Sequence, residues 1–339
     1  MNNNKINLVD FTREDLANHL KQIGEKPFRA TQIIKWIHQQ RVTDFNMMTN
    51  LAKSFRQYLI DNTEIIFPEI ITMQISQDGT VKWLLKLQDS ICIETVFIPE
   101  ADRGTLCIST QAGCPLQCDF CATGKQGFTR NLTFGEIIGQ LWLAKKDYAV
   151  TNVVIMGMGE PLLNFDNTVR AVNLMLDDNA YGLSKYKVTV STSGLVPEMR
   201  RFSKLSDVAF AVSLHAPNDE LRSKLMPINK KYPLKELIAA CKEYYTDQRR
   251  KITFEYIMIA GINDTLDCAK QLVQLLRGIS CKINLIPCNE HVNNKYKASS
   301  QQQIDKFRDI LMAAGFNTIT RKTRGADIDA ACGQLAGNN

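Results

Sequence analysis

Hydrophobic and polar positions follow two different rhythms along the chain, and from residue 105 onward the two rhythms alternate. Apolar, β-rich runs predict strands at about residues 105–110, 152–157, 187–192, 207–214, 251–259, 281–287 and 316–321. Apolar positions at helical spacing predict helices between them, at about residues 133–147, 165–178, 196–204, 233–246, 265–278 and 300–314. Strands that alternate with helices form βα units around a parallel sheet. About six units are too few for a closed eight-stranded barrel, so we expect an α/β fold with an open, partial (β/α)6-type barrel.

The first hundred residues follow other patterns. Residues 10–62 carry apolar positions at helical spacing, and Thr12 is a suitable N-cap for the first of several short helices. Residues 81–98 alternate between apolar and other positions on either side of a turn, which predicts a β-hairpin. We therefore expect a small helical N-terminal accessory domain at residues 1–75, a β-hairpin linker at 76–99, the barrel core at 100–322 and a C-terminal tail at 323–339.

Three cysteines lie close together just after the first predicted strand of the barrel. Cys114, Cys118 and Cys121 follow a C-x3-C-x2-C spacing, and Phe120 directly precedes the last of them. Three such thiolates can bind one metal centre, and a [4Fe-4S] cluster held by only three cysteines keeps one iron open for a small molecule. A structural zinc site needs four ligands. The alternative is therefore a zinc knuckle with Cys107 as its fourth ligand.

Polar residues follow the predicted strands at the edge where the working groups of such barrels lie. The second strand is followed by Gly159 and Glu160, and a glycine lets the backbone approach a ligand closely. His215 stands at the tip of the fourth strand, which favours a site role over a structural one, whereas a plain tight turn is the alternative at Gly159. We expect one pocket lined by polar strand ends, which include Gly159, Glu160, Ser191, Ser213, His215 and Asn289.

Two further residues differ from their surroundings. Glu94 lies inside an apolar strand, where a carboxylate must be paired, protonated or exposed at the edge of a pocket. Cys332 lies in a Gly- and Ala-rich stretch after the last strand, where no core packing demands a thiol. The small flanking residues favour a thiol that moves and reacts over a buried filler cysteine.

Composition places the chain among ordinary globular proteins, at 339 residues with 45% hydrophobic and 22% charged residues. No apolar run reaches the roughly 18 residues of a membrane span, and the N-terminus lacks a signal-peptide pattern. We therefore expect a cytoplasmic protein with no membrane partner. The ten cysteines are expected to stay reduced there or to bind metal.

Positive charge is concentrated in one segment. The chain has a net charge of +6, and residues 222–251 alone hold nine Lys or Arg against three Asp or Glu. Such a segment either binds the phosphates of a nucleic acid or forms a solvated helix face, and charge alone does not separate the two. The first interpretation predicts salt-sensitive RNA binding that charge reversal at Arg249 and Arg250 weakens.

Six stretches of the sequence are similar to motifs of one known family. They read Glu94-T-V-F-I-P, Cys107-I-S-T-Q-A-G-C, Met156-G-M-G-E-P-L-L-N, Ser213-L-H-A-P-N, Ser223-K-L-M-P-I-N and Asp327-I-D-A-A-C-G-Q-L. Over nearly its whole length the chain resembles the RlmN/Cfr family of radical S-adenosylmethionine (SAM) RNA (adenine) methyltransferases, and it is closer to the RlmN side. The resemblance implies a radical SAM barrel with a [4Fe-4S] cluster and SAM as cofactors. It also implies methylation of carbon 2 of adenine in 23S ribosomal RNA and in tRNA.

The resemblance further implies a role for each site residue. Cys114, Cys118 and Cys121 would hold the cluster, which gives Cys107 a different task and weighs against the zinc alternative. The implied catalytic residues are Glu94, Cys107 and Cys332. The implied SAM-binding residues are Gly159, Glu160, Ser191, Ser213, Leu214, His215 and Asn289.

The implied chemistry uses two SAM molecules and an external electron donor. The first SAM methylates Cys332, and one electron from the cluster cleaves the second to a radical that takes a hydrogen from that methyl group. The resulting carbon radical adds to adenine and leaves a protein–RNA thioether. Glu94 removes the proton from carbon 2, and attack of Cys107 on the sulfur of Cys332 forms a disulfide that releases the methylated RNA. We expect a monomer. The alternatives are a radical SAM enzyme with another substrate and a zinc-stabilised RNA-binding module.

Overall fold

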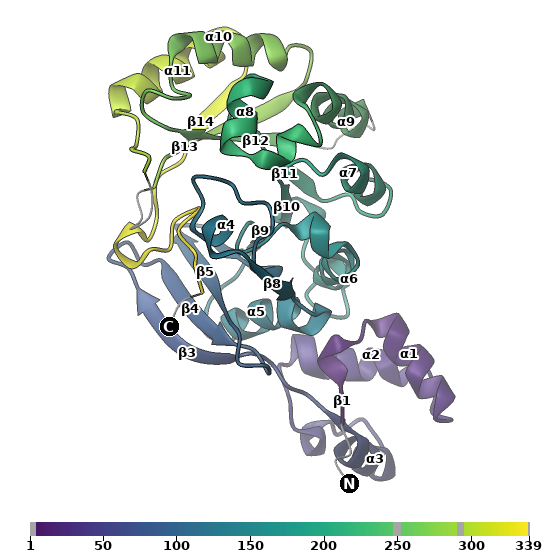
Figure 1. Cartoon of the computed structure of the whole chain (residues 1–339). Helices are drawn as coiled ribbons and strands as arrows, with labels where there is room; N and C mark the ends of the chain where they lie inside the picture. Colours follow the sequence, from purple (N-terminus) through teal and green to yellow (C-terminus); the bar gives the residue numbers. More distant parts are fainter. Residues whose placement is uncertain (1–4, 247–251, 290–294, 338–339) are drawn as a thin grey trace.

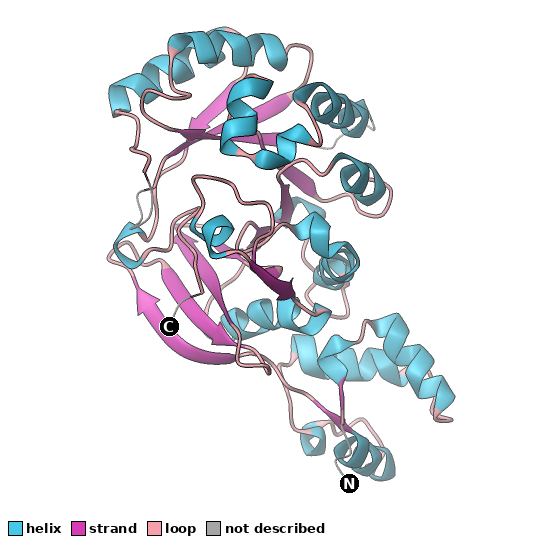
Figure 2. Cartoon of the chain, viewed as in Figure 1, coloured by secondary structure: helices cyan, strands magenta, loops and turns pink. Residues whose placement is uncertain are grey.

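One mixed sheet forms the centre of the molecule (Figures 1 and 2). The computed structural model describes residues 5–246, 252–289 and 295–337. Within these residues the sheet has ten strands in the order β14-β13-β12-β11-β10-β9-β6-β5-β4-β3. β14 and β3 are the two ends of this order, so the sheet is open, as the sequence predicts.

The parallel part of the sheet contains every strand predicted for the barrel. These strands are β6 (Arg103–Cys107), β9 (Asn152–Ile155), β10 (Val188–Thr192), β11 (Ala209–Ser213), β12 (Ile252–Met258), β13 (Cys281–Pro287) and β14 (Asn317–Thr320). Helices connect them in sequence order, namely α5 (Phe134–Asp147), α6 (Phe165–Leu176), α7 (Val196–Phe202), α9 (Leu234–Thr246), α10 (Leu266–Leu275) and α11 (Gln301–Ala313). The alternating pattern therefore predicted the βα units correctly, because each helix buries one apolar face against the sheet.

The antiparallel part extends the same sheet and corrects one expectation. β4 (Val81–Lys86) and β5 (Cys92–Glu100) form the predicted hairpin, and β5 also pairs with β6. A further strand, β3 (Glu69–Ile75), lies in the range that the sequence placed in the helical domain. All residues of β3 are exposed, so neither of its faces imposes the apolar alternation by which a strand is recognised.

The small N-terminal domain contains α1 (Arg13–Gln22), α2 (Arg29–Ile34) with a π-helical continuation at Lys35–Gln39, and α3 (Lys53–Asn62). A short parallel pair, β1 (Ile6–Asn7) with β2 (Thr63–Glu64), closes it. Thr12 is the N-cap of α1, as predicted, and forms a reciprocal capping box with Asp15.

This domain packs on α5 of the barrel (Figure 1). The indole of Trp142 donates to the carbonyl of Ile37 at 2.7 Å, and the amide of Gly135 donates to Asp10 Oδ1 at 2.8 Å. A Cβ at Gly135 would lie 2.7 Å from the same Asp10 oxygen, so a glycine permits this close approach. One continuous hydrophobic core extends from Leu8 to Leu335. In the described part of the chain, no helix is both long and apolar enough to cross a bilayer.

Four short elements near the cysteine loop were not predicted from the sequence. They are the β7–β8 pair (Gln111–Gly113 and Phe128–Asn131), α4 (Ala122–Gln126) and α8 (Asp219–Leu225). The β7–β8 pair and α4 frame the cysteine loop, and α8 is the next element after β11. These elements are too short to display a helical or strand period, yet they position much of the site described below.

Candidate active site

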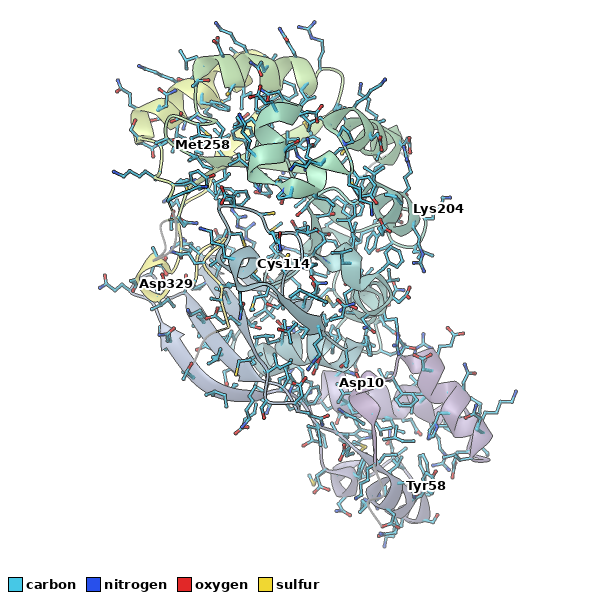
Figure 3. All side chains as sticks on the ribbon, viewed as in Figure 1. Asp10, Tyr58, Cys114, Lys204, Met258 and Asp329 are labelled. Carbon is cyan, nitrogen blue, oxygen red and sulfur yellow. The ribbon has the colours of Figure 1, made fainter. Side chains whose placement is uncertain are left out.

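The three clustered cysteines lie in a loop between β7 and α4, near the middle of the molecule, where Figure 3 labels Cys114. Two hydrogen bonds hold this loop, one to the residue before β8 and one to the end of α8. The amide of Cys114 donates to Gly127 O at 2.7 Å, and the amide of Asp119 donates to Leu225 O at 3.0 Å. The loop is therefore held against α8, the helix that follows β11.

The electrostatics of the loop suit a metal centre. Burial raises the pKa of Cys114 to about 12, and it also raises the pKa of Cys118 and of Cys121. The charges of Cys121 and Cys114 raise the pKa of Cys118 further, so the three sulfurs lie close enough to repel one another as thiolates. A positive iron–sulfur centre would remove this repulsion by ligating all three.

The geometry suits a cluster better than a single ion. Among the described residues, no three His, Cys, Asp or Glu side chains are grouped as they would be around one metal ion. Thiolates on different irons of a cluster stand further apart than ligands of one zinc. Cys107, the fourth ligand of the zinc alternative, instead has Cys332 and Arg321 as charged neighbours.

Glu160 follows β9, is buried, and accepts two hydrogen bonds from backbone amides. Its Oε2 accepts the amide of Ser193 at 2.7 Å and its Oε1 accepts the amide of Leu162 at 3.2 Å. Burial raises the pKa of this carboxyl. Gly159 has a φ of +96°, and a Cβ there would lie 2.5 Å from Gln111 Cβ, so the turn requires glycine.

His215 follows β11 in a left-handed backbone conformation, with φ of +60°. Its Nδ1 accepts the amide of Ile257 at 3.1 Å, and its ring lies edge-on to Phe120 of the cysteine loop. Burial, with a smaller effect of the nearby Arg222, lowers the pKa of His215 to about 3, so the ring is neutral with its proton on Nε2. Asn263, which the sequence analysis missed, holds this turn by donating to His215 O at 2.8 Å.

Arg222 corrects the interpretation of residues 222–251 as one basic face. It is only 1% exposed, and its guanidinium donates to Ser193 O, Ser213 O, Leu214 O and Asn229 Oδ1 at 2.7 to 3.1 Å. It therefore ties together the ends of β10 and β11, where Ser191, Ser213 and Leu214 lie. Helical spacing could have revealed this, because Arg222 shares a face of α8 with the buried Leu225.

The rest of that basic segment divides into two parts. The lysines that the structure describes are exposed, and they are Lys224, Lys230, Lys231, Lys235 and Lys242. Lys224 pairs with Glu220 at 2.8 Å. Arg249, Arg250 and Lys251 lie outside the described residues, so the predicted effect of charge reversal at Arg249 and Arg250 stays a prediction.

Glu94, on β5, is buried and paired, which excludes the exposed-edge alternative. Its side chain is 7% exposed, and its Oε1 lies 2.9 Å from Nζ of Lys82 on the neighbouring strand β4. Its Oε2 accepts the amides of Ala336 and Gly337 at 2.7 and 3.0 Å. The Lys82 ammonium and two amide dipoles therefore compensate this carboxylate.

Cys332 lies on the C-terminal tail, which passes between the antiparallel strands and α4 (Figure 1). The residue is exposed, and its carbonyl accepts Asn289 Nδ2 at 3.1 Å. Asn289, the predicted ligand-binding tip of β13, therefore contacts the tail in this structure. Its Oδ1 also accepts the hydroxyl of Thr323 at 3.2 Å.

Cys107 and Arg321 lie close to Cys332. Burial raises the pKa of Cys107 to about 12, and the charge of Cys332 raises it further, whereas Arg321 lowers it. The charge of Cys332 is also the largest cause that raises the pKa of Arg321. Arg321 follows β14, faces Glu255 across 3.9 Å, and was not singled out in the sequence. One cation therefore lies near two thiols, of which one ends the first parallel strand of the barrel and the other lies on the C-terminal tail.

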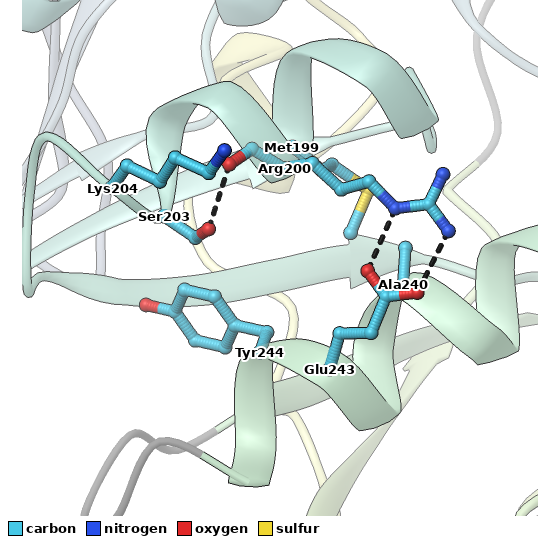
Figure 4. A pocket seen from close by; sticks show the side chains of 7 residues that line it. All are labelled: Met199, Arg200, Ser203, Lys204, Ala240, Glu243 and Tyr244. Carbon is cyan, nitrogen blue, oxygen red and sulfur yellow. Dashed lines mark hydrogen bonds and ion pairs between the residues drawn. The ribbon is translucent and has the colours of Figure 1, made fainter.

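A separate groove lies between α7 and α9 (Figure 4). An ion pair of 2.7 Å between Arg200 and Glu243 spans it, and Lys204 and Tyr244 also line it. Figure 3 shows Lys204 at the outer rim, far from Cys114. None of the predicted site residues lines this groove.

Comparisons with known proteins agree with this arrangement. Residues 6–65 match the family model of the ribosomal RNA large subunit methyltransferase N-terminal domain, and residues 108–276 match that of the radical SAM superfamily. The crystal structure of a radical SAM methyltransferase from Sphaerobacter thermophilus is similar over 98% of this chain and 100% of that chain, with 41% identity and a TM-score of 0.93. This chain belongs to the RlmN/Cfr family of radical SAM methyltransferases.

The cofactors of this RlmN/Cfr-family enzyme are a [4Fe-4S] cluster and SAM. Streptococcus suis SuiB bound to S-adenosylmethionine shares the fold, at 15% identity over 63% of this chain and 49% of that chain, with a TM-score of 0.50. The family match also decides between enzyme and zinc-stabilised module in favour of the enzyme.

Proposed function

We propose that this enzyme methylates carbon 2 of adenine in 23S ribosomal RNA and in tRNA, with Cys332 as the carrier of the methyl group. The observation that carries the proposal is the position of the tail. The amide of Ala122, directly after Cys121, donates to Gly333 O at 2.8 Å, so the residue after Cys332 is bonded to the cysteine loop. A reactive thiol on the tail is thereby brought to the proposed cofactor site.

In this proposal, Cys114, Cys118 and Cys121 ligate the cluster through their thiolates. The strand ends beside the loop bind SAM, and the residues assigned to this are Gly159, Glu160, Ser191, Ser213, Leu214, His215 and Asn289. When bound, the cluster and SAM supply the radical chemistry that an electron-poor ring carbon requires. The neutral His215 and the buried Glu160 contribute a fixed polar wall on one side of this pocket.

Cys332 first accepts a methyl group on its sulfur, because a thiolate is a good nucleophile whereas carbon 2 of adenine is not. This methyl group would give up one hydrogen atom to the radical that the bound cofactors supply, and its carbon would then bond to carbon 2 of adenine, so that Cys332 holds the RNA through a thioether. The hydrogen of carbon 2 would leave as a proton and the odd electron would return to the cofactors. Cys107 then attacks the sulfur of Cys332 as a thiolate, so that an S–S bond forms as the C–S bond breaks, and the electron pair of that bond stays on the carbon, which takes up a proton to become the new methyl group. Support for this pairing comes from the effect of Cys332 on the pKa of Cys107 and from Arg321, whose charge favours the thiolate of Cys107.

Glu94 is assigned the removal of the proton from carbon 2. Lys82 is positioned to keep one oxygen of this carboxylate fixed, at 2.9 Å. The other oxygen is bonded to the tail itself, within hydrogen-bond distance of Ala336 and Gly337. Glu94 and the tail on which Cys332 lies are therefore neighbours, as they must be to act on the same adenine.

RNA and an external electron donor are the partners in this proposal. An RNA substrate is consistent with the exposed lysines of residues 224–242, which offer positive charge for contacts with phosphates. Adenine in a loop or bulge is reachable because unstacked bases can enter a protein pocket.

The first test is the mass of the Cys332 peptide from enzyme that carries its cluster and has been given SAM without reductant or RNA. One added methyl group on Cys332 is the expected result. An unmodified Cys332 on a protein with an intact cluster would overturn the carrier role. Assay of 23S rRNA and tRNA fragments then tests the substrate, and SAM cleavage without methylated adenine would favour a radical SAM enzyme with another substrate.

A further inference from the structure

The tail beyond Cys332 is held by groups from two separate elements. The Thr123 hydroxyl on α4 donates to Leu335 O at 2.6 Å, one residue along from the Ala122–Gly333 bond. The Glu94 carboxylate on β5 then accepts the next two amides. We name this arrangement the tail clasp, made by Ala122, Thr123 and Glu94 on residues 333–337.

We propose that Thr123 is a positioning residue for Cys332. Thr123 is 4% exposed, and it stands two residues after Cys121, so its hydroxyl moves with the cysteine loop. The tail reads A-A-C-G-Q-L-A-G, and Ala330, Ala331, Gln334 and Leu335 are buried. Hydrogen bonds to its backbone add direction to this packing, and Thr123 provides the one side-chain hydroxyl among the clasp groups.

The tail is also fixed on the other side of Cys332. Asp327 Oδ2 accepts the amide of Gln77 at 3.1 Å, in the turn between β3 and β4, and the amide of Gly325 donates to Asp78 at 3.2 Å. Cys332 thus lies in the span between this turn and α4. Next to Cys332 itself the chain is held by the bonds from Ala122 to Gly333 O and from Asn289 to Cys332 O. Loss of the Thr123 bond leaves these two bonds to open and close more often, so the thiol spends less time near Cys107 and Arg321.

Thr123 and Glu94 differ in whether they can hold the tail during the reaction, and this difference rests on the proposed function of Glu94 as the base. A carboxylate that accepts the proton of adenine must expose an oxygen, and Glu94 Oε2 is covered by Ala336 and Gly337. The Glu94 end of the clasp therefore opens during proton removal. Thr123 and Ala122 can keep their bonds at that moment, so they hold Cys332 in place when Glu94 does not.

The test compares Thr123→Val, which keeps the shape and removes the donor, with Thr123→Ser, which keeps the donor. Hydrogen exchange of the tail peptide is followed in the cluster-containing enzyme without SAM or RNA. We expect Thr123→Val to speed exchange at Ala336 and Gly337 by about fivefold, the effect of losing one ordinary hydrogen bond. Thr123→Ser should restore the wild-type rate, and exchange in α5 should stay unchanged in both variants.

Turnover supplies a second readout. Thr123→Val should lower kcat for RNA methylation by about tenfold while leaving KM for SAM unchanged, and Thr123→Ser should recover most of kcat. Because the Thr123 side chain also hydrogen-bonds Cys121, iron content is measured in each variant. A loss of iron or a raised KM for SAM would indicate a defect at the cofactor site instead of a loosened tail. Wild-type tail exchange and wild-type kcat in Thr123→Val would overturn the proposal.

Gly337→Ala loosens the clasp from its other end and serves if Thr123→Val does not fold. Gly337 has a φ of +60°, and a Cβ there would lie 2.8 Å from Cys92 O, so alanine displaces the end of the tail. We expect faster exchange at Ala336 in this variant, with the Thr123 bond to Leu335 retained. If wild-type Cys332 takes no methyl group, the proposed function fails, while the comparison of hydrogen exchange in the tail still tests the clasp. Normal methylation of Cys332 with unchanged tail exchange in both variants overturns the clasp alone.

Discussion

Oε2 of Glu94 accepts the amide of Ala336 at 2.7 Å, although the two residues lie 242 positions apart in the chain. This bond places the end of the tail against the residue proposed to take the proton from adenine. The tail on which Cys332 lies and the proposed base, Glu94, are therefore in direct contact. Their separate contributions can be distinguished by changing one group at a time.

Glu94→Gln is the first such change. It keeps the size of the side chain but removes the basic carboxylate, so release of RNA from the Cys332 adduct should slow by about 100-fold or more. Methylation of Cys332 without reductant should continue. A time course of free and protein-bound RNA on a denaturing gel measures both. Glu69→Gln, on an exposed glutamate of β3, is the matched control and should leave both rates unchanged.

Cys107→Ala removes the thiol proposed to break the thioether. We expect the reaction to stop with RNA attached to Cys332, which a mass spectrum of the nuclease-treated peptide identifies. Cys92→Ala replaces a half-buried cysteine on β5 and should turn over normally. Free RNA together with unmodified Cys332 in the Cys107→Ala protein would contradict the assigned role.

Arg321→Met tests the cation near the two thiols. Burial raises the pKa of Cys107 to about 12 and Arg321 lowers it, so loss of Arg321 should raise this pKa further. The thiolate fraction below a pKa grows about tenfold per pH unit, so release of RNA should rise with pH in both proteins and be slower in the variant at every pH. Single-turnover release between about pH 7 and 9 measures this. Lys322→Met, at the exposed neighbour, should match the wild type; an identical profile for Arg321→Met would refute the role.

Arg222→Met removes the buried guanidinium that joins β10 to β11. Four oxygen acceptors lose their donor, and burial already lowers the pKa of Arg222 to about 10. We expect the free energy of unfolding to fall by about 3 kcal/mol or more and the affinity for SAM to weaken. Denaturant titration and SAM binding measure the two effects. Lys224→Met, on the exposed side of the same helix, should change stability by less than about 0.5 kcal/mol.

Burial of His38 makes the folding stability of the protein depend on pH. It is buried against Tyr181, with Nδ1 at 3.0 Å from the hydroxyl, and burial lowers its pKa from 6.5 to about 3. The unfolded state therefore binds a proton below 6.5 while the folded state does not, so stability is full above 6.5 and falls as pH drops toward 3. The slope from this group approaches about 1.4 kcal/mol per pH unit. Thermal unfolding of wild type and His38→Leu across this range should show a shallower slope in the variant; equal slopes would exclude His38 as the cause.

The fold followed closely from the sequence because its signals are local and repeated. The strands and helices of the barrel each show their own period over several residues, and Thr12 caps α1 through a residue only three positions away. Strand β3 gave no such signal, because all its residues are exposed. Charge counting misplaced Arg222, because composition records a charge but not the direction in which the side chain points.

The sequence by itself determined the open barrel, the family, and which residues merit attention, since C-x3-C-x2-C and the other motifs are contiguous. Only the tertiary structure decided which of these residues contact one another. It paired Glu94 with Lys82, brought Arg321 to Cys107 and Cys332, and laid the tail across Thr123. These contacts join residues that are far apart in the chain or on neighbouring strands. No local period records such contacts, because they form only when the sheet, the cysteine loop and the tail pack together.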